Sequence, residues 1–80
     1  MVSKQDETFL AIAQAGSISK AAQRLYLSQP ALSSSLKRLE EDLGAQLFDR
    51  EAAPLRLTQA GERYLRYVRE NQERERRLRQ

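Results

Sequence analysis

The 80-residue sequence contains no cysteine and no histidine. Without cysteine the chain forms no disulfide and offers no thiol nucleophile. Without histidine it lacks the most common general base and metal ligand. Its carboxylates are scattered or gathered at residues 40–42, which we interpret as the solvated end of a helix. These absences argue against an enzyme and predict neither a metal site nor a cofactor.

Long apolar runs are also missing. No segment is long and apolar enough to span a bilayer, and the start of the chain, MVSKQDE, lacks the apolar core of a signal peptide. We therefore expect a cytoplasmic protein that does not insert into a membrane. With 40% hydrophobic and 31% charged residues, the composition suits one small globular domain.

Acidic residues are absent from the stretch between Thr8 and Leu39. Four basic residues fall within that stretch: Lys20, Arg24, Lys37 and Arg38. The net charge of +3 comes entirely from residues 62–80, so the charges of residues 1–61 sum to zero. The local basic stretch fits a contact with nucleic acid, and it also fits an ordinary solvated face.

Helix start and stop signals divide the first half of the chain into three segments. Ser3, Ser17 and Ser28 are good N-caps, because a serine hydroxyl can accept a hydrogen bond from an amide of the first turn. Gly16 and Gly44 suit the left-handed residue that often follows a helix. The expected helices span about residues 3–15, 17–25 and 28–43, with a tight turn at residues 26–27.

The third of these segments has two different faces. Four leucines at helical spacing mark a stripe that we expect to be buried: Leu32, Leu36, Leu39 and Leu43. The opposite face carries short, polar or cationic side chains and no carboxylate: Gln29, Pro30, Ser33, Ser34 and Lys37. A slender face of this kind suits the DNA major groove. The sequence thus predicts a helix-turn-helix whose recognition helix begins at Ser28.

The periodicity changes after the third helix. Residues 46–50 and 55–57 suggest two short strands with a hairpin tip at residues 51–54, and a hairpin in this position is a wing. Thr58 then caps a fourth helix, in which Gly61 is expected to cost about 1 kcal/mol relative to alanine. The predicted fold class is mainly α: a winged helix-turn-helix, with a three-helix core and a two-stranded wing, followed by a long linker helix.

Apolar residues in the fourth helix occur in its first half and spread widely around the helix axis. This spread predicts burial on two sides, against the domain and against a second subunit. The residues concerned are Tyr64, Leu65, Tyr67 and Val68, with Tyr64 favoured for the domain core. We therefore divide the chain into a winged helix-turn-helix domain at residues 1–58, with the motif at about 17–43, and a linker and dimerisation helix at residues 59–80.

At these positions the chain resembles the N-terminal DNA-binding domain of LysR-type transcriptional regulators. The resemblance runs without a gap over residues 9–61. It rests on Phe9, Gly16-Ser17, Ala21-Ala22, Leu25, Ser28-Gln29-Pro30-Ala31-Leu32-Ser33, Leu39-Glu40, Leu43-Gly44, Leu47-Phe48, Arg50 and Leu57-Thr58-x-Ala60-Gly61. It implies a sequence-specific bacterial regulator that binds duplex DNA. The chain looks like such a regulator cut off inside or just after its linker helix.

The same resemblance implies the partners. They are double-stranded operator DNA and a second copy of the chain, whose linker helix pairs antiparallel with the first. The operator would then be an imperfect inverted repeat with one recognition helix in each half-site. The resemblance also allows a tetramer for the full-length parent. It assigns a small-molecule inducer only to the effector domain, which is absent here.

The DNA contacts of the family can be carried over residue by residue. Gln29 matches a glutamine that meets base edges or backbone, and its amide can bond bidentately to adenine. Pro30 and Ala31 offer apolar contact to a thymine methyl group, and the small Ser33 lets the helix come close. Arg50 matches an arginine at the base of the wing that contacts phosphate. The remaining candidates are Ser17, Lys20 and Lys37 for phosphates, Ser34 on the exposed face, and Arg56 as a cation of the wing.

Three positions depart from the family pattern. Ser34-Ser35 stand where many relatives have Arg-Gln, which removes a guanidinium that could contact guanine. The tip of the wing, residues 51–54, carries Glu51 where relatives are usually basic. Asp6 stands where relatives often have leucine. Specificity should therefore depend more on Gln29 and DNA shape, and the acidic tip disfavours insertion of the wing into the minor groove.

Structural interpretations of the same residues remain open. Gln29 could only complete the start of its helix, and the serines at 33–35 could be solvated surface. Arg50 could pair with Asp49 or Glu51 instead of phosphate. Lys20 and Arg24 fit idle solvated charges as well as phosphate contacts. As an alternative function, the acidic wing and the zero net charge of residues 1–61 favour a winged-helix module for protein interaction.

Overall fold

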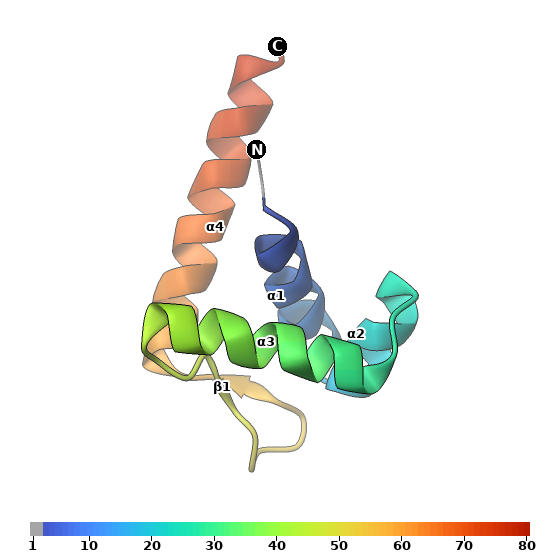
Figure 1. The fold of residues 1–80 in the computed structure, drawn as a ribbon. Coiled ribbons are helices and arrows are strands. Elements are labelled where there is room, and N and C mark those ends of the chain that lie inside the picture. Colours follow the sequence, from blue (N-terminus) through green and yellow to red (C-terminus); the bar gives the residue numbers. More distant parts are fainter. Residues whose placement is uncertain (1–2) are drawn as a thin grey trace.

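The computed structural model describes residues 3–80. Within them the order is α1 (Lys4–Ala15), α2 (Ile18–Leu25), α3 (Gln29–Leu43), β1 (Phe48–Asp49), β2 (Arg56–Leu57) and α4 (Gln59–Leu78) (Figure 1). The predicted winged helix-turn-helix and the long fourth helix are confirmed, although each strand has only 2 residues and is shorter than predicted. The first two residues of the expected 1–58 domain lie outside the described range. No helix in residues 3–80 is long and apolar enough to cross a membrane.

Each helix begins at the cap that the sequence predicts. One hydroxyl at each start accepts a hydrogen bond from a backbone N–H of the first turn, at 3.0–3.2 Å; the four residues are Ser3, Ser17, Ser28 and Thr58. Gly16 and Gly44 end α1 and α3 in the left-handed conformation, with φ of 68° and 71°. Tyr26 ends α2 with φ of 57°, which is uncommon for a residue with a side chain.

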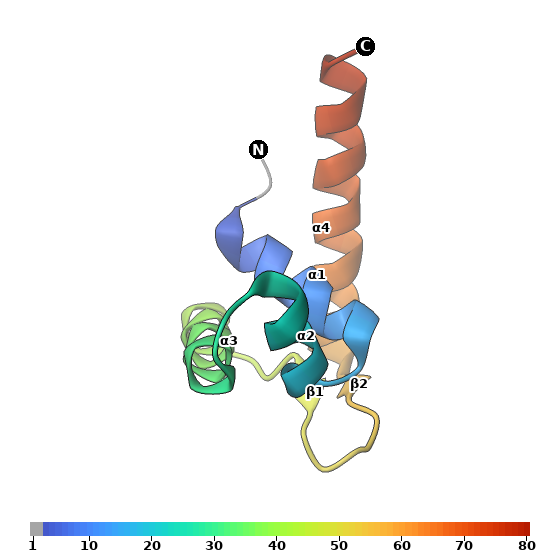
Figure 2. The same cartoon turned by 90° about the vertical axis from the view of Figure 1, so that its right-hand side faces the viewer.

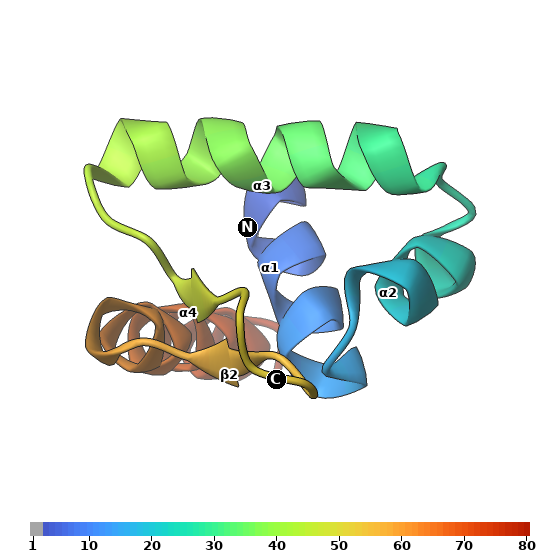
Figure 3. The ribbon, with the colours of Figure 1, turned by 90° about the horizontal axis from the view of Figure 1, so that it is seen from below.

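The three core helices and the wing form the base from which α4 leaves. Seen from the side of the hairpin, α1 lies between α3 and α4 (Figure 3), and α2 packs against both α1 and α3. The strands β1 and β2 pair in an antiparallel arrangement, with Phe48 opposite Leu57. The distal end of α4 points away from the tip of the hairpin (Figure 2). α3 and the hairpin therefore remain accessible on the side that α4 does not occupy.

Within the described residues 3–80, ten buried apolar residues make the core: Phe9, Ile12, Ala21, Ala22, Leu32, Leu36, Leu39, Leu47, Phe48 and Val68. The ring of Phe9 on α1 lies at the centre, with its centroid 5.4 Å from that of Phe48 and 4.9 Å from that of Tyr64. Aromatic pairs at such separations attract each other in addition to burying apolar surface. Phe9 thus joins the first strand of the wing to α4.

Two predictions for the end of α3 are wrong. Leu43, expected in the buried stripe, is 45% exposed, because α1 packs against the middle of α3 and does not cover its last turn (Figure 3). Glu40, expected at a solvated helix end, is buried. Its carboxylate accepts a hydrogen bond from the backbone N–H of Leu47 at 2.7 Å. A buried carboxylate is tolerated where it is hydrogen-bonded in this way.

Gly61 is needed for close packing, which helix propensity alone does not reveal. A Cβ built at this position would lie 2.0 Å from the carbonyl oxygen of Leu47 and 3.0 Å from Cδ2 of Leu57. The first turn of α4 therefore passes directly against the backbone that leads into the wing. From helix propensity we expect alanine to be more stable than glycine at this position. That expectation is wrong, because a methyl group has no room there.

Candidate nucleic-acid interface

A groove runs between the start of α2, the start of α3 and the wing. It brings together side chains from three separate parts of the sequence, among them Ser17, Lys20, Gln29 and Arg50. Four of the predicted DNA contacts therefore meet on one surface. The residues that line the groove include two cations and no carboxylate. Together with the positive ends of the two helix dipoles, this arrangement favours an anion such as phosphate.

Ser17 and Lys20 lie at the first turn of α2. The Oγ of Ser17 accepts a hydrogen bond from the backbone N–H of Lys20 at 3.2 Å. The hydroxyl hydrogen of Ser17 is not used in this bond and can be donated to another acceptor. The side chain of Lys20 is exposed. Ser19 also lines the groove and was not among the predicted site residues; its place directly before Lys20 is the signal that could have identified it.

The exposed face of α3 has the composition that the sequence predicts. Its accessible residues are Gln29, Pro30, Ala31, Ser34 and Lys37, while Ser33 is half-buried. Leu32, Leu36 and Leu39 are buried on the opposite side. Because residues three and four apart share a face of a helix, Pro30, Ser34 and Lys37 follow one line along α3. The helix therefore presents a surface without bulky side chains over its first two turns.

Arg50 is held at the edge of the groove by the buried carboxylate of Glu40. Its Nη2 donates a hydrogen bond to Oε1 of Glu40 at 2.7 Å. The suggested pairing with Asp49 or Glu51 is wrong, since the Asp49 side chain instead accepts a hydrogen bond from the backbone N–H of Glu51. The Arg50 side chain is still 45% exposed. Sequence reasoning missed the role of Glu40, although its position next to Leu39 on the buried stripe was a signal.

The wing is fixed to the junction between α1 and α2. The backbone N–H of Leu55 donates a hydrogen bond to the carbonyl oxygen of Gly16 at 3.0 Å. Pro54 packs close to Gly16, since a Cβ added to that glycine would lie 3.4 Å from the Cβ of Pro54. Leu55 and residues 52–54 line the groove, whereas Arg56, exposed on β2, is not part of its lining. The structure therefore separates Arg56 from Lys20 and Arg50, and the lining does not include Lys37 either.

The four residues predicted for dimerisation have different environments. Val68 is fully buried in the domain core, so it has no surface to offer to a second subunit and its predicted role is wrong. Tyr64 packs against the core and donates a hydrogen bond from its hydroxyl to Oδ1 of Asp6. Leu65 is half-buried, and Tyr67 is 55% exposed. Tyr67 stacks on Tyr64 with ring centroids 5.7 Å apart.

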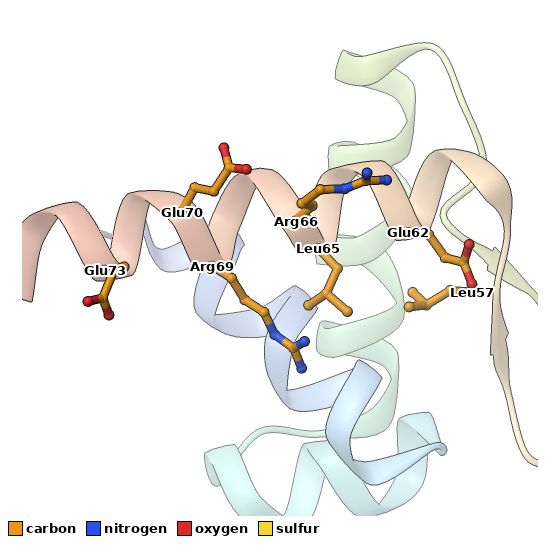
Figure 4. Close-up of a pocket in the computed structure, with 7 residues that line it drawn as sticks. All are labelled: Leu57, Glu62, Leu65, Arg66, Arg69, Glu70 and Glu73. Carbon is orange, nitrogen blue, oxygen red and sulfur yellow. The ribbon is translucent and has the colours of Figure 1, made fainter.

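A second shallow groove follows α4. Leu65 and Leu57 form its apolar part, and charged side chains of both signs surround them: Glu62, Arg66, Arg69, Glu70 and Glu73. Figure 4 shows Leu65 and Arg69 on the same side of α4, with Leu57 of β2 beyond them. This surface lies away from the groove at the start of α3, so the two candidate contact surfaces are distinct.

The phenol of Tyr64 has a shifted ionisation. Burial and the hydrogen bond to Asp6 raise the pKa of Tyr64 well above its ordinary value of about 10. A raised pKa in the folded state stabilises the fold fully below the pKa of the unfolded chain. That contribution is lost as the pH rises above about 10.

We therefore predict a difference between wild type and Tyr64→Phe in alkaline solution. The free energy of unfolding, measured by urea denaturation, should fall more for wild type than for the variant between about pH 9 and pH 11. Every other ionisable side chain is present in both proteins, so the comparison isolates the Tyr64 hydroxyl. An equal fall in both proteins would show that the Tyr64 hydroxyl contributes nothing.

Within residues 3–80 no group of three or more histidine, cysteine, aspartate or glutamate side chains lies close enough to hold a metal ion.

The family model described as bacterial regulatory helix-turn-helix protein, lysR family, matches residues 3–62. The chain belongs to the LysR family. The matched range contains the whole groove and the exposed face of α3.

Similar proteins of this family include the HTH-type transcriptional regulator MetR of Haemophilus influenzae. It is 50% identical over 64 residues, which make up 80% of this chain and 21% of MetR. The regulator TfdT of Cupriavidus pinatubonensis is 45% identical over 62 residues, or 78% of this chain and 27% of TfdT. The chain thus spans 21% and 27% of the lengths of these two relatives.

Solved structures with the same fold include two DNA complexes. The BenM DNA-binding domain with benA site 1 DNA has a TM-score of 0.86 and 31% identity, covering 94% of this chain and 84% of that chain. The CbnR DNA-binding domain with DNA has a TM-score of 0.82 and 38% identity, covering 92% and 85%. The winged helix-turn-helix fold of LysR regulators is therefore established for this chain.

Proposed function

We propose that this chain binds duplex DNA in a sequence-specific manner, as the DNA-binding domain of a bacterial LysR-type transcriptional regulator. The observation that carries the proposal is the slender, exposed start of α3 beside a groove lined by Lys20 and Arg50 without any carboxylate. DNA bound to the similar BenM and CbnR domains supports the proposal. Such a protein acts where bacterial genomic DNA lies, in the cytoplasm.

Each candidate residue has a role that its position suggests. Base contacts are assigned to the exposed start of α3: Gln29, Pro30, Ala31, Ser33 and Ser34. Phosphate contacts are assigned to the cations and hydroxyl around it: Ser17, Lys20, Lys37 and Arg50. Arg56 lies outside the groove, so we assign it at most a separate backbone contact through the wing.

For assembly, we assign residues 1–58 to DNA binding and residues 59–80 to a linker helix that pairs with a second copy. Tyr64, Leu65 and Tyr67 are the predicted contact residues that retain accessible surface on α4. A dimer would place two copies of α3 on the half-sites of an inverted repeat. It would also raise the effective concentration of the second domain once the first is bound.

Replacing Gln29 by alanine tests the central contact. We expect affinity for a cognate duplex, selected from a random library with the wild-type chain, to fall by about 1–3 kcal/mol, which is about 5- to 150-fold. The discrimination against substituted bases at that position should also weaken. Fluorescence polarisation with labelled duplexes measures both effects.

Gln14→Ala is the matched control, since Gln14 is an exposed glutamine on α1 that lies outside both the groove and the linker helix. It should leave affinity unchanged. An equal loss for cognate and random duplexes would assign Gln29 to the backbone and remove its role in specificity. If the wild-type chain binds no duplex even at low salt, DNA binding is wrong and the protein-interaction module takes its place.

A further inference from the structure

Asp6 and Tyr64 form a polar connection between α1 and α4. The hydroxyl of Tyr64 donates a hydrogen bond to Oδ1 of Asp6, a residue that is only 8% exposed. The two residues are 58 positions apart in the sequence. A buried hydrogen bond to a carboxylate is directional and stronger than one between neutral groups. It therefore fixes the orientation of α4 more closely than apolar packing alone.

The elements around this hydrogen bond link it to the recognition helix. On α1, the ring of Phe9 packs edge-on against Tyr64, with centroids 4.9 Å apart and an interplanar angle of 81°. α1 itself packs against α3. α1 therefore links α4 to α3, in addition to the contact that the start of α4 makes with Leu47 and β2. At position 6, where the family resemblance leads us to expect leucine, this chain has the aspartate that accepts this hydrogen bond.

We propose that the hydrogen bond between Asp6 and Tyr64 determines the angle at which α4 leaves the domain, and so the separation of half-sites that a dimer accepts. This inference rests on the proposed function, since it concerns how two copies are placed on DNA. Neither residue lines the groove at the start of α3. They act as positioning residues for the exposed face of α3.

A small change of angle has a large effect at the distance involved. α4 has 20 residues and is therefore about 30 Å long. A tilt of about 10° moves a point at that distance by about 5 Å, which exceeds the rise of about 3.4 Å per base pair. Losing the hydrogen bond should therefore shift or broaden the preferred half-site separation by at least about one base pair.

Three variants separate positioning from stability. Tyr64→Phe removes only the hydroxyl and keeps the ring that packs on Phe9. The double variant Asp6→Leu with Tyr64→Phe removes both polar partners, so no buried group is left unpaired and folding should be preserved. Asp6→Asn is the conservative control, because its side-chain carbonyl can still accept the hydrogen bond from Tyr64.

The experiment selects duplexes from a library of random sequence with each 80-residue chain and compares the enriched sites. Wild type and Asp6→Asn should enrich two half-sites at one preferred separation. Tyr64→Phe and the double variant should enrich the same half-site sequence at a shifted or broader range of separations. Affinity for a single half-site should stay within about twofold of wild type in all variants, since none of them changes the face of α3.

Two results would overturn the inference. One is a double variant that keeps the wild-type separation or loses the half-site sequence. The other is a wild-type chain that enriches only isolated half-sites, which would leave DNA binding intact but remove the dimer geometry. If the wild-type chain enriches no sequence at all, the proposed function itself fails, so the two failures are distinguishable.

Discussion

Gly61→Ala should destabilise the domain by about 3 kcal/mol or more, although alanine is the better helix former. The new methyl group would lie 2.0 Å from the carbonyl oxygen of Leu47, and backbone cannot move aside as a flexible side chain can. To relieve the overlap, the first turn of α4 must shift away from the wing. Urea denaturation followed by circular dichroism measures the change, and the midpoint should fall without a change in slope.

Gly44→Ala is the matched control for this substitution. Gly44 also lies at a helix end, but a Cβ added there meets nothing within 4 Å. Its cost should be confined to the left-handed backbone, with φ of 71°, and amount to about 1 kcal/mol. If Gly61→Ala is no more destabilising than Gly44→Ala, the close approach of α4 to Leu47 is not as described.

Glu40→Ala should lower the free energy of unfolding by about 2 to 3 kcal/mol. The substitution leaves the backbone N–H of Leu47 without its acceptor and releases the guanidinium of Arg50. The loss should stay below that of a fully buried ion pair, because the Arg50 side chain is 45% exposed. Denaturation at neutral pH measures it directly.

Glu41→Ala removes the same charge from the neighbouring, exposed position and should leave stability within about 0.5 kcal/mol of wild type. Comparing the DNA affinities of the two variants also tests whether Glu40 holds Arg50 in the position that contacts DNA. Relative to Glu41→Ala, folded Glu40→Ala should bind duplex DNA about fivefold more weakly, equal to about 1 kcal/mol. Equal affinities would show that Arg50 does not need Glu40 to reach phosphate.

The buried network around Glu40 illustrates why part of the site could not be predicted. In the sequence, Glu40 is the first of three consecutive acidic residues, all with the same charge, and nothing local distinguishes it from the other two. Only the first of them lies beside the buried stripe and faces the backbone of Leu47, 7 residues later. Sequence distance does not reveal such a contact, because it depends on how the chain turns between α3 and β1.

The sequence by itself determined the local structure. The hydroxyl caps fix where each helix begins, the glycine stops fix where α1 and α3 end, and the apolar period indicates most of the buried face of α3, because these signals act over three or four residues. It also identified the exposed start of α3 and most of the cations beside it. The short range of these interactions is the reason that they could be recognised without a structure.

Only the tertiary structure decided which of these features meet. It placed Ser17, Lys20, Gln29 and Arg50 around one groove and excluded Arg56 from it. It also buried Val68 in the core, and it joined residues far apart in the chain, as at Asp6 and Tyr64. These outcomes depend on the packing of whole helices against each other, where a contact between distant residues forms only after both elements have taken their places.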